Sequence, residues 1–359
     1  MMASLEIKTI LASNKKAKPD ENNLGFGKYF TDHMFVMEYS EDIGWHDPKI
    51  TPYEPLSVEP AAMVFHYGQS VFEGLKAYKS PEGKILLFRP WDNFKRLNIS
   101  DDRMCIPHID EEFALKALIE LVKIDADWIP TAPGTSLYIR PFVIATEPSV
   151  KVMASKNYKF IIILSPVGPY YPSGLAPIDI LVEDEYVRAV RGGIGAAKAS
   201  ANYAASLKAQ QKATQKGYAQ VMWLDGLERK YIDEVGAMNV FFVINEELIT
   251  PELNGSILAG ITRDSVIKMA KSWGVKVTER KLSIAEVFDA AKDGSLKEAF
   301  GCGTAAVISP IKSFIMGDEK VQVADGKTGQ LSGKLYDNLT GIQFGRIEDT
   351  LGWTVEVKL

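Results

Sequence analysis

The sequence predicts an α+β fold in two halves, and three observations support this prediction. The chain has 359 residues, 46% of them hydrophobic, which is enough for two domains with cores of their own. Short apolar runs typical of strands are separated by segments with the period of a helix. Residues 166–177 hold four prolines and two glycines, and so predict a stiff, non-helical connector.

The first half, residues 1–167, is expected to be the smaller domain and to mix strands with helices. Residues 111–128 carry apolar side chains at helical spacing and predict a helix. Four apolar runs predict strands, at 33–39, 84–88, 136–145 and 158–167. The connector is assigned to residues 168–177, and its paired tyrosines, Tyr170 and Tyr171, indicate that it also faces a ligand.

The second half, residues 178–359, is expected to be the larger domain. Its predicted strands are 178–182, 219–224, 231–234, 238–245, 275–279 and 306–311. Its predicted helices are 200–216, 263–273, 283–291 and 334–348. Asp225-Gly226 is a strong hairpin signal between two of these strands, and Gly217 is expected to end the first helix.

Composition excludes several classes of function. The net charge of -5 gives no reason to expect nucleic-acid binding, which favours a basic face. The longest apolar run, 160–164, is far shorter than the roughly 18 residues of a membrane span. Residues 1–20 lack the apolar segment of a secretion signal, and two distant cysteines fit a reducing compartment. We therefore expect a cytoplasmic protein, with no membrane association and no metal site.

The most informative segment is Gly192-Gly193-Ile194-Gly195-Ala196-Ala197-Lys198-Ala199-Ser200-Ala201-Asn202-Tyr203. Its small residues leave room for a flat ligand and give Lys198 no neighbouring counter-charge. Desolvation lowers the pKa of a lysine and makes its amine a nucleophile. The alternative is a lysine extending to solvent at the start of an alanine-rich helix. A phosphate-binding P-loop is excluded because alanines flank Lys198, and a dinucleotide fingerprint is excluded because Gly193 and Gly195 are not followed by the further glycine that it needs.

Three further segments complete a possible cofactor site. Gly260-Ile261-Thr262 begins a predicted helix, whose free N–H groups favour a phosphate. The turn Gly303-Thr304-Ala305 could bind an anion, or could simply join two strands. Glu234 lies among apolar residues, and could pair with a ring nitrogen or with a structural arginine. Together with Lys198 these are the parts of a pyridoxal phosphate site.

The chain resembles the branched-chain amino acid aminotransferases of the fold-type IV pyridoxal phosphate enzymes, from about residue 25 to the C-terminus. The segments that carry the resemblance are Phe26–Met34, His66-Tyr67-Gly68, Phe72–Tyr78, Phe88–Leu97, Ser136–Pro141 and the three second-half segments above. The resemblance implies a fold like that of D-amino acid aminotransferase. Such a fold has a small α/β domain and a larger domain with a pseudo-barrel sheet.

The resemblance also implies residue roles. Lys198 would form the Schiff base with pyridoxal 5'-phosphate and transfer protons. The other cofactor-binding residues would be Arg96, Tyr203, Glu234, Ile261, Thr262 and Thr304. The substrate-binding residues would be Phe30, Tyr67, Phe72, Tyr138, Arg140, Tyr170, Thr304 and Ala305, with Arg140 receiving the distal carboxylate of glutamate. Without the resemblance, Arg96 could be a surface pair with Asp92, and Tyr67 and Phe72 could be core aromatics.

The implied reaction is reversible transfer of the amino group of leucine, isoleucine or valine to 2-oxoglutarate. It would be the last step of branched-chain amino acid biosynthesis or the first of degradation. Alternatives are a D-amino acid aminotransferase, an aminodeoxychorismate lyase, or a non-catalytic pyridoxal phosphate-binding protein. Ala306 and Ser309 stand where animal members have a Cys-x-x-Cys pair, which favours a bacterial type. The family implies a homodimer or larger assembly, with residues 148–153 as the candidate loop that completes the partner's pocket.

Overall fold

The computed structural model describes residues 5–170 and 174–359, which divide into two compact units. The first unit contains residues 5–170, 197–201 and 341–359, and the second contains 174–196 and 202–340. Lys198 therefore belongs to the first unit, although the residues on either side of its segment belong to the second. Tyr171, one of the paired tyrosines of the connector, lies outside the described residues.

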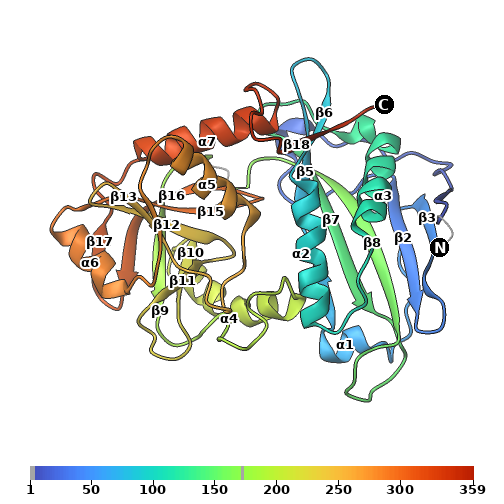
Figure 1. The fold of residues 1–359 in the computed structure, drawn as a ribbon, viewed down its shortest axis with the longest axis horizontal. Coiled ribbons are helices and arrows are strands. Elements are labelled where there is room, and N and C mark those ends of the chain that lie inside the picture. Colours follow the sequence, from blue (N-terminus) through green and yellow to red (C-terminus); the bar gives the residue numbers. More distant parts are fainter. Residues whose placement is uncertain (1–4, 171–173) are drawn as a thin grey trace. The chain divides into compact units, whose positions relative to one another are not determined.

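The first unit is built on a nine-stranded sheet in the order β1-β3-β2-β8-β7-β5-β6-β18, with β4 also paired to β7 (Figure 1). All these pairs are antiparallel except β1 with β3. The strands are β1 (Lys8–Thr9), β2 (His33–Ser40), β3 (Gly44–Pro52), β4 (Ser70–Phe72), β5 (Leu75–Lys79), β6 (Ile85–Phe88), β7 (Ser136–Ala145), β8 (Asn157–Val167) and β18 (Thr354–Val357).

Three helices accompany this sheet: α1 (Met63–Tyr67), α2 (Pro90–Arg103) and α3 (Glu111–Ile124). Asp110 caps α3, because its carboxylate accepts the N–H of Phe113. The apolar side of α3, including Leu118 and Leu121, is fully buried in the core of the unit. A short 3-10 turn, Ala126–Trp128, follows α3, so the predicted helix 111–128 ends four residues early.

The second unit contains another nine-stranded sheet, in the order β11-β10-β9-β16-β15-β12-β13-β14, with β17 paired to β16. Parallel and antiparallel pairs are mixed in it. The strands are β9 (Ile178–Glu183), β10 (Gln220–Leu224), β11 (Ile232–Val235), β12 (Asn239–Ile244), β13 (Glu247–Thr250), β14 (Val277–Glu279), β15 (Leu296–Gly303), β16 (Val307–Met316) and β17 (Glu319–Gln322).

Helices pack on both faces of this second sheet. The helices are α4 (Ser200–Gln215), α5 (Ile261–Ser272), α6 (Ile284–Lys292) and α7 (Gln330–Gln343). Ala209 and Ala213 of α4 pack with Trp223, whereas Val287 and Phe288 of α6 share a core with Met222. Since neighbouring residues of a strand point to opposite faces, Met222 and Trp223 of β10 place these two cores on opposite sides of the sheet.

The predicted α+β fold is confirmed, but the element pattern differs from the prediction both at element ends and in whole elements. The predicted helix 334–348 instead begins at Gln330 and ends at Gln343. Its early start has a cause that local sequence cannot reveal, because the Glu298 carboxylate of β15 accepts the N–H groups of Leu331 and Ser332. Elements that the sequence did not predict include α1, α2 and β3 to β5.

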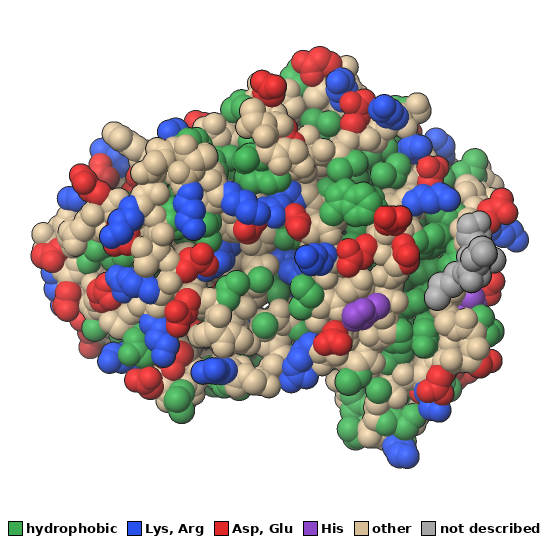
Figure 2. All heavy atoms as spheres, viewed as in Figure 1, with side chains coloured by type: hydrophobic (Ala, Val, Ile, Leu, Met, Phe, Trp, Pro, Cys, Tyr) green, Lys and Arg blue, Asp and Glu red, His purple; other side chains and the backbone are tan. Residues whose placement is uncertain are grey.

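Two further features concern the surface charge and the length of the helices. Figure 2 shows basic and acidic side chains interspersed on the face it presents. In the described parts of the chain, no helix combines the length and the apolar character needed to cross a membrane.

Candidate active site

The segment that carries Lys198 is bound to the first unit by its backbone. Its N–H donates to the Ser100 hydroxyl of α2 at 2.9 Å, and its carbonyl accepts the N–H of Phe72 at 3.1 Å. Ala199 forms an isolated antiparallel bridge with Val71 of β4. Helix α4 begins only at Ser200, two residues beyond Lys198. Lys198 is thus fixed at the edge of β4 and is not a side chain on a helix surface.

The amine of Lys198 lies in surroundings that disfavour its charge. Burial, followed by the positive charge of Arg96, lowers the pKa of Lys198 from 10.5 to about 8. Glu73 acts in the opposite direction, but more weakly than these two effects. The amine also lies 5.3 Å from the centre of the Phe72 ring. Burial therefore makes the neutral, nucleophilic form of Lys198 far more accessible near neutral pH than it is for an ordinary lysine.

Arg96 of α2 is bound to Glu73, and the alternative of a surface pair with Asp92 is wrong. Its Nε and a terminal nitrogen donate to the two Glu73 oxygens at 2.7 and 2.8 Å. Asp92 pairs instead with Arg89, at 2.7 Å. Glu73 is fully buried and also accepts from the Asn93 amide. Burial would raise the pKa of Glu73, but Arg96 and the hydrogen bonds hold it below its usual value.

A second acid of α2 lies near this pair without any hydrogen bond. Asp101 is fully buried, and neither of its carboxyl oxygens has a hydrogen-bond partner among the described residues. Burial, followed by the negative charge of Glu73, raises the pKa of Asp101 well above 3.8. The charged form of Asp101 is therefore unfavourable in the folded protein, in contrast to that of Glu73.

Arg140 and Tyr138 of β7 form the polar side of the same cluster. A terminal nitrogen of Arg140 donates to the Tyr138 hydroxyl at 3.1 Å, and the guanidinium lies 4.5 Å from the Phe72 ring centre. The Nε of Arg140 is buried and has no hydrogen-bond partner among the described residues. A Cβ at Gly74 would collide with the Tyr138 hydroxyl, so glycine is required there. We call Lys198, Phe72, Glu73, Arg96, Tyr138 and Arg140 the Lys198 cluster.

The remaining predicted pocket residues of the first unit have different surroundings. Phe26 packs edge-to-face against both Tyr138 and Tyr170, with ring centres 4.9 and 5.3 Å apart. Burial raises the pKa of Tyr170. Phe30 stacks on Tyr53 at 5.1 Å. The structure therefore links Tyr170 to the Lys198 cluster through Phe26.

Tyr67 lies at an exposed apolar surface of α1. Its hydroxyl donates to the Val150 carbonyl, and the loop 148–153 is further bound to this region by Ser149 N–H to Ala61 O at 2.9 Å. Phe65, Tyr67, Val150 and Val152 are 64%, 37%, 70% and 80% exposed. The alternative of a core aromatic is wrong for Tyr67. Exposed apolar side chains held close together, as Tyr67 and Val150 are, are typical of interaction surfaces.

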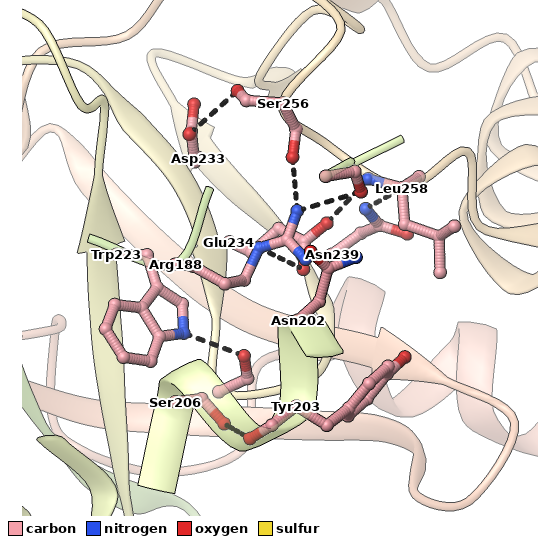
Figure 3. Close-up of polar contacts among 12 residues, drawn as sticks. Arg188, Asn202, Tyr203, Ser206, Trp223, Asp233, Glu234, Asn239, Ser256 and Leu258 are labelled. Carbon is pink, nitrogen blue, oxygen red and sulfur yellow. Dashed lines mark hydrogen bonds and ion pairs between the residues drawn. The ribbon is translucent and has the colours of Figure 1, made fainter. Parts of the chain in front are cut away.

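In the second unit, Glu234 of β11 is buried and held at both oxygens (Figure 3). Its Oε1 accepts the N–H of Leu258 at 2.8 Å, and its Oε2 lies 3.3 Å from the Nε of Arg188. The preceding Asp233 accepts from the Ser256 hydroxyl at 2.9 Å. Burial raises the pKa of Asp233. We call Arg188, Asp233, Glu234, Ser256 and Leu258 the Glu234 cluster.

The other predicted residues of the second unit lie on α4, at the start of α5 and in the turn after β15. Tyr203 lies on the neighbouring helix α4 in Figure 3. Helix α5 begins with Ile261 and Thr262, and its N-cap, Gly260, provides no side-chain cap. Thr304 and Ala305 lie in the turn between β15 and β16, which does join two antiparallel strands. Val307 ends this turn with φ +62, a costly conformation for a β-branched residue.

Several residues in or beside these clusters were not predicted from the sequence. Glu73, Phe26 and Lys76 lie within the segments that carry the resemblance, which implies no role for them. Lys76 is buried opposite Tyr138 in the β5–β7 pair, and burial lowers its pKa to about 8. Arg188 carried no signal, because nothing in the chain around it predicts that its guanidinium is buried.

Comparisons with known proteins show which family the chain resembles. The sequence model of the amino-transferase class IV family matches residues 70–314. The branched-chain-amino-acid aminotransferase 2 of Bacillus subtilis (strain 168) is 62% identical over 356 residues, which cover 99% of this chain and 98% of that protein. Among the described residues, no group of three or more His, Cys, Asp or Glu side chains could hold a metal ion.

Solved structures of branched-chain amino acid aminotransferases are also similar to this chain. The branched-chain amino acid aminotransferase of Escherichia coli superposes with a TM-score of 0.77 at 30% identity, covering 91% of this chain and 99% of that one. The branched-chain amino acid aminotransferase of Thermobaculum terrenum, solved in a pyridoxal phosphate form, superposes with a TM-score of 0.73. It is 25% identical and covers 91% of this chain and 99% of that one.

Proposed function

Since the chain belongs to the amino-transferase class IV family, we propose that it transfers the amino group of leucine, isoleucine or valine to 2-oxoglutarate, with pyridoxal 5'-phosphate as cofactor. The observation that carries this proposal is the Lys198 amine. It has a pKa of about 8 and lies on a backbone bound to both α2 and β4. A nucleophilic lysine of this kind is what the cofactor requires.

The residues present fit pyridoxal phosphate chemically. The group has an aldehyde, a phosphate and a ring nitrogen, and the chain offers an amine, the N-terminal end of α5 and a buried carboxylate for these. The Arg140 Nε is buried without a hydrogen-bond partner among the described residues, which supports a ligand carboxylate beside it. When bound, the cofactor supplies an electron sink for the bond-breaking at the substrate α-carbon.

Each residue would then act on a stated part of the reaction. Lys198 would take the proton from the substrate α-carbon and donate it to the C4′ carbon of the cofactor, because an amine with a pKa of about 8 can both accept and donate near neutral pH. Glu234 would hold the proton on the ring nitrogen, and Tyr203 would donate to the ring oxygen. Arg96, Ile261, Thr262 and Thr304 would bind the phosphate.

The substrate pocket must accept both an aliphatic side chain and the distal carboxylate of glutamate. Phe30, Tyr67, Phe72 and Tyr170 would form its apolar walls. Tyr138, with the N–H groups near Thr304 and Ala305, would bind the α-carboxylate. Arg140 would pair with the distal carboxylate, and its position over the Phe72 ring keeps its charge against an aromatic face that tolerates it.

We further propose that the chain forms a homodimer or larger assembly in the cytoplasm. The exposed side chains of Phe65, Tyr67, Val150 and Val152 support the assembly, because apolar side chains exposed to water gain free energy when they are buried against another subunit. The loop 148–153 remains the candidate that completes the pocket of the partner. Neither nucleic acid nor a membrane is proposed as a partner.

A single assay tests the proposed reaction. The protein loaded with pyridoxal phosphate is given leucine, isoleucine, valine or D-alanine with 2-oxoglutarate, and glutamate formation is measured. We expect glutamate from the three branched-chain substrates and none from D-alanine. Glutamate from D-alanine alone would favour the D-amino acid aminotransferase. Bound cofactor with no transfer from any substrate would favour a non-catalytic binding protein.

A further inference from the structure

Arg188 connects three separate segments of the second unit with one guanidinium group (Figure 3). A terminal nitrogen donates to the Gly195 carbonyl at 3.2 Å and also to the Ser256 carbonyl. The Nε lies 3.3 Å from Glu234, within ion-pair distance. The side chain of Arg188 is only 9% exposed, and that of Glu234 is 4% exposed. A planar guanidinium with five donors can make such contacts at once, and a lysine ammonium is a poor substitute.

The contact with Gly195 concerns the segment that leads to Lys198. Gly195 lies three residues before Lys198 in the chain. A Cβ at Gly195 would collide with the Ser256 carbonyl oxygen and with the Ala189 side chain. The glycine segment, residues 192–195, therefore packs so closely against the turn 254–258 that only glycine fits at position 195. Arg188 lies at this contact and binds a carbonyl from each side of it.

The contact with Glu234 concerns the orientation of its carboxylate. Leu258 N–H fixes one oxygen and Arg188 lies beside the other. A carboxylate has about four acceptor positions, so these two contacts are compatible with a further donor. Leu258 belongs to the same turn as Ser256. By binding the Ser256 carbonyl, Arg188 therefore also helps to hold the Leu258 N–H that donates to Glu234.

We propose that Arg188 is a positioning residue, which holds the Glu234 carboxylate, the turn 254–258 and the glycine segment before Lys198 in one fixed arrangement. This inference rests on the proposed function, in which Glu234 pairs with the ring nitrogen of pyridoxal phosphate. Arg188 acts through Glu234 and through the two carbonyls, and does not itself contact the substrate.

The test compares Arg188→Met, which keeps much of the apolar stem, with Arg188→Lys, which keeps the charge. Amide hydrogen exchange of the cofactor-free protein is measured in residues 190–196 and 254–258. We expect faster exchange in both segments for both variants, with the larger increase in Arg188→Met. The control is Arg280→Met, which removes an ion pair with Glu286 elsewhere in the same unit and should leave both segments unchanged.

The second measurement is the dissociation constant of pyridoxal phosphate, followed by absorbance. Loss of a hydrogen-bonded charged group predicts an increase of about tenfold or more for Arg188→Met. In a Glu234→Gln background the faster exchange at 190–196 should persist, because the bonds to the carbonyls do not depend on the carboxylate. Exchange and affinity in Arg188→Met equal to those of Arg280→Met would overturn the proposal.

The two measurements also separate this inference from the proposed function. If the unaltered protein did not bind pyridoxal phosphate, the proposed function would be wrong, and the exchange experiment would still decide whether Arg188 fixes the two segments. If the protein bound the cofactor and Arg188→Lys behaved as the unaltered protein in both measurements, charge alone would suffice. The three-point arrangement would then be rejected.

Discussion

The Lys198 cluster and the Glu234 cluster handle buried charge in opposite ways. In the first, burial and then the guanidinium groups of Arg96 and Arg140 lower the pKa of the Lys198 amine to about 8. In the second, the Glu234 carboxylate has a cation and a backbone N–H at its two oxygens. The first cluster destabilises a charge, as a reactive group requires, and the second stabilises one, as an electrostatic partner requires.

Replacing Lys198 tests the reactive side of this comparison and should have the largest effect. Lys198→Ala should abolish amine transfer, because no other group would carry the cofactor. The control is Lys76→Met, since burial lowers the pKa of Lys76 to about 8 as well. Borohydride reduction of the loaded protein, followed by peptide mapping, should label Lys198 in both the unaltered protein and Lys76→Met. A label on Lys76 would show that the wrong lysine has been assigned.

Replacing Glu234 tests the stabilising side. Glu234→Gln should keep the fold and bind the cofactor, while turnover falls on the order of 10²-fold, as for other electrostatic stabilisers. The matched control is Asp233→Asn, the preceding carboxylate, which is bonded to Ser256. Steady-state turnover of both variants decides the matter. An equal loss in both would mean that Glu234 has only a structural role.

Arg140 allows a finer test within the Lys198 cluster. Arg140→Met removes the partner of the distal carboxylate and keeps an apolar side chain over Phe72. Loss of such a partner costs about 1.5–3 kcal/mol, or one to two decades in rate or affinity. The loss should fall on the glutamate half-reaction and spare the leucine half-reaction, both measured in single turnover. Arg346→Met, an exposed arginine of the same unit, is the control. Equal losses in both half-reactions would contradict the assigned role.

Asp101 should give the smallest effect, on stability and not on chemistry. The pKa of this acid is raised in the folded protein above its ordinary 3.8, so the folded state binds more protons than the unfolded state at pH values above 3.8. Stability is therefore lost as pH rises through this window. Asp101→Asn should remove that loss and be more stable by about 1–3 kcal/mol near neutral pH. Chemical unfolding at several pH values measures it.

The control for Asp101 is its neighbour Asp102, whose side chain is 82% exposed. Asp102→Asn should leave the pH dependence of unfolding unchanged. A constant difference between Asp101→Asn and the unaltered protein at all pH values would show that the Asp101 carboxyl does not titrate in the way proposed.

The sequence predicted the helices α3 to α7 and several of the longer strands, because apolar periodicity is a local property, but it missed α1, α2 and β3 to β5. It also identified Lys198 and Glu234 as candidates, since small or apolar neighbours flank both. It could not predict that Arg96 binds Glu73, 23 residues away, and not the closer Asp92. Arg188 was missed for the same reason, because its partners are two backbone carbonyls and a distant acid, which no local pattern encodes.

The pairing of β18 with β6 has a consequence for the order in which the protein folds. Residues 354–357 extend the first unit's sheet, and Trp353 packs on Phe88 and accepts the Arg89 N–H at 2.7 Å. These residues follow the whole second unit in the chain. During synthesis, β6 therefore lacks its β18 partner until about 260 further residues have been made. An open edge can pair with other chains. Removal of residues 353–359 should therefore cause aggregation of newly made protein rather than a simple loss of activity.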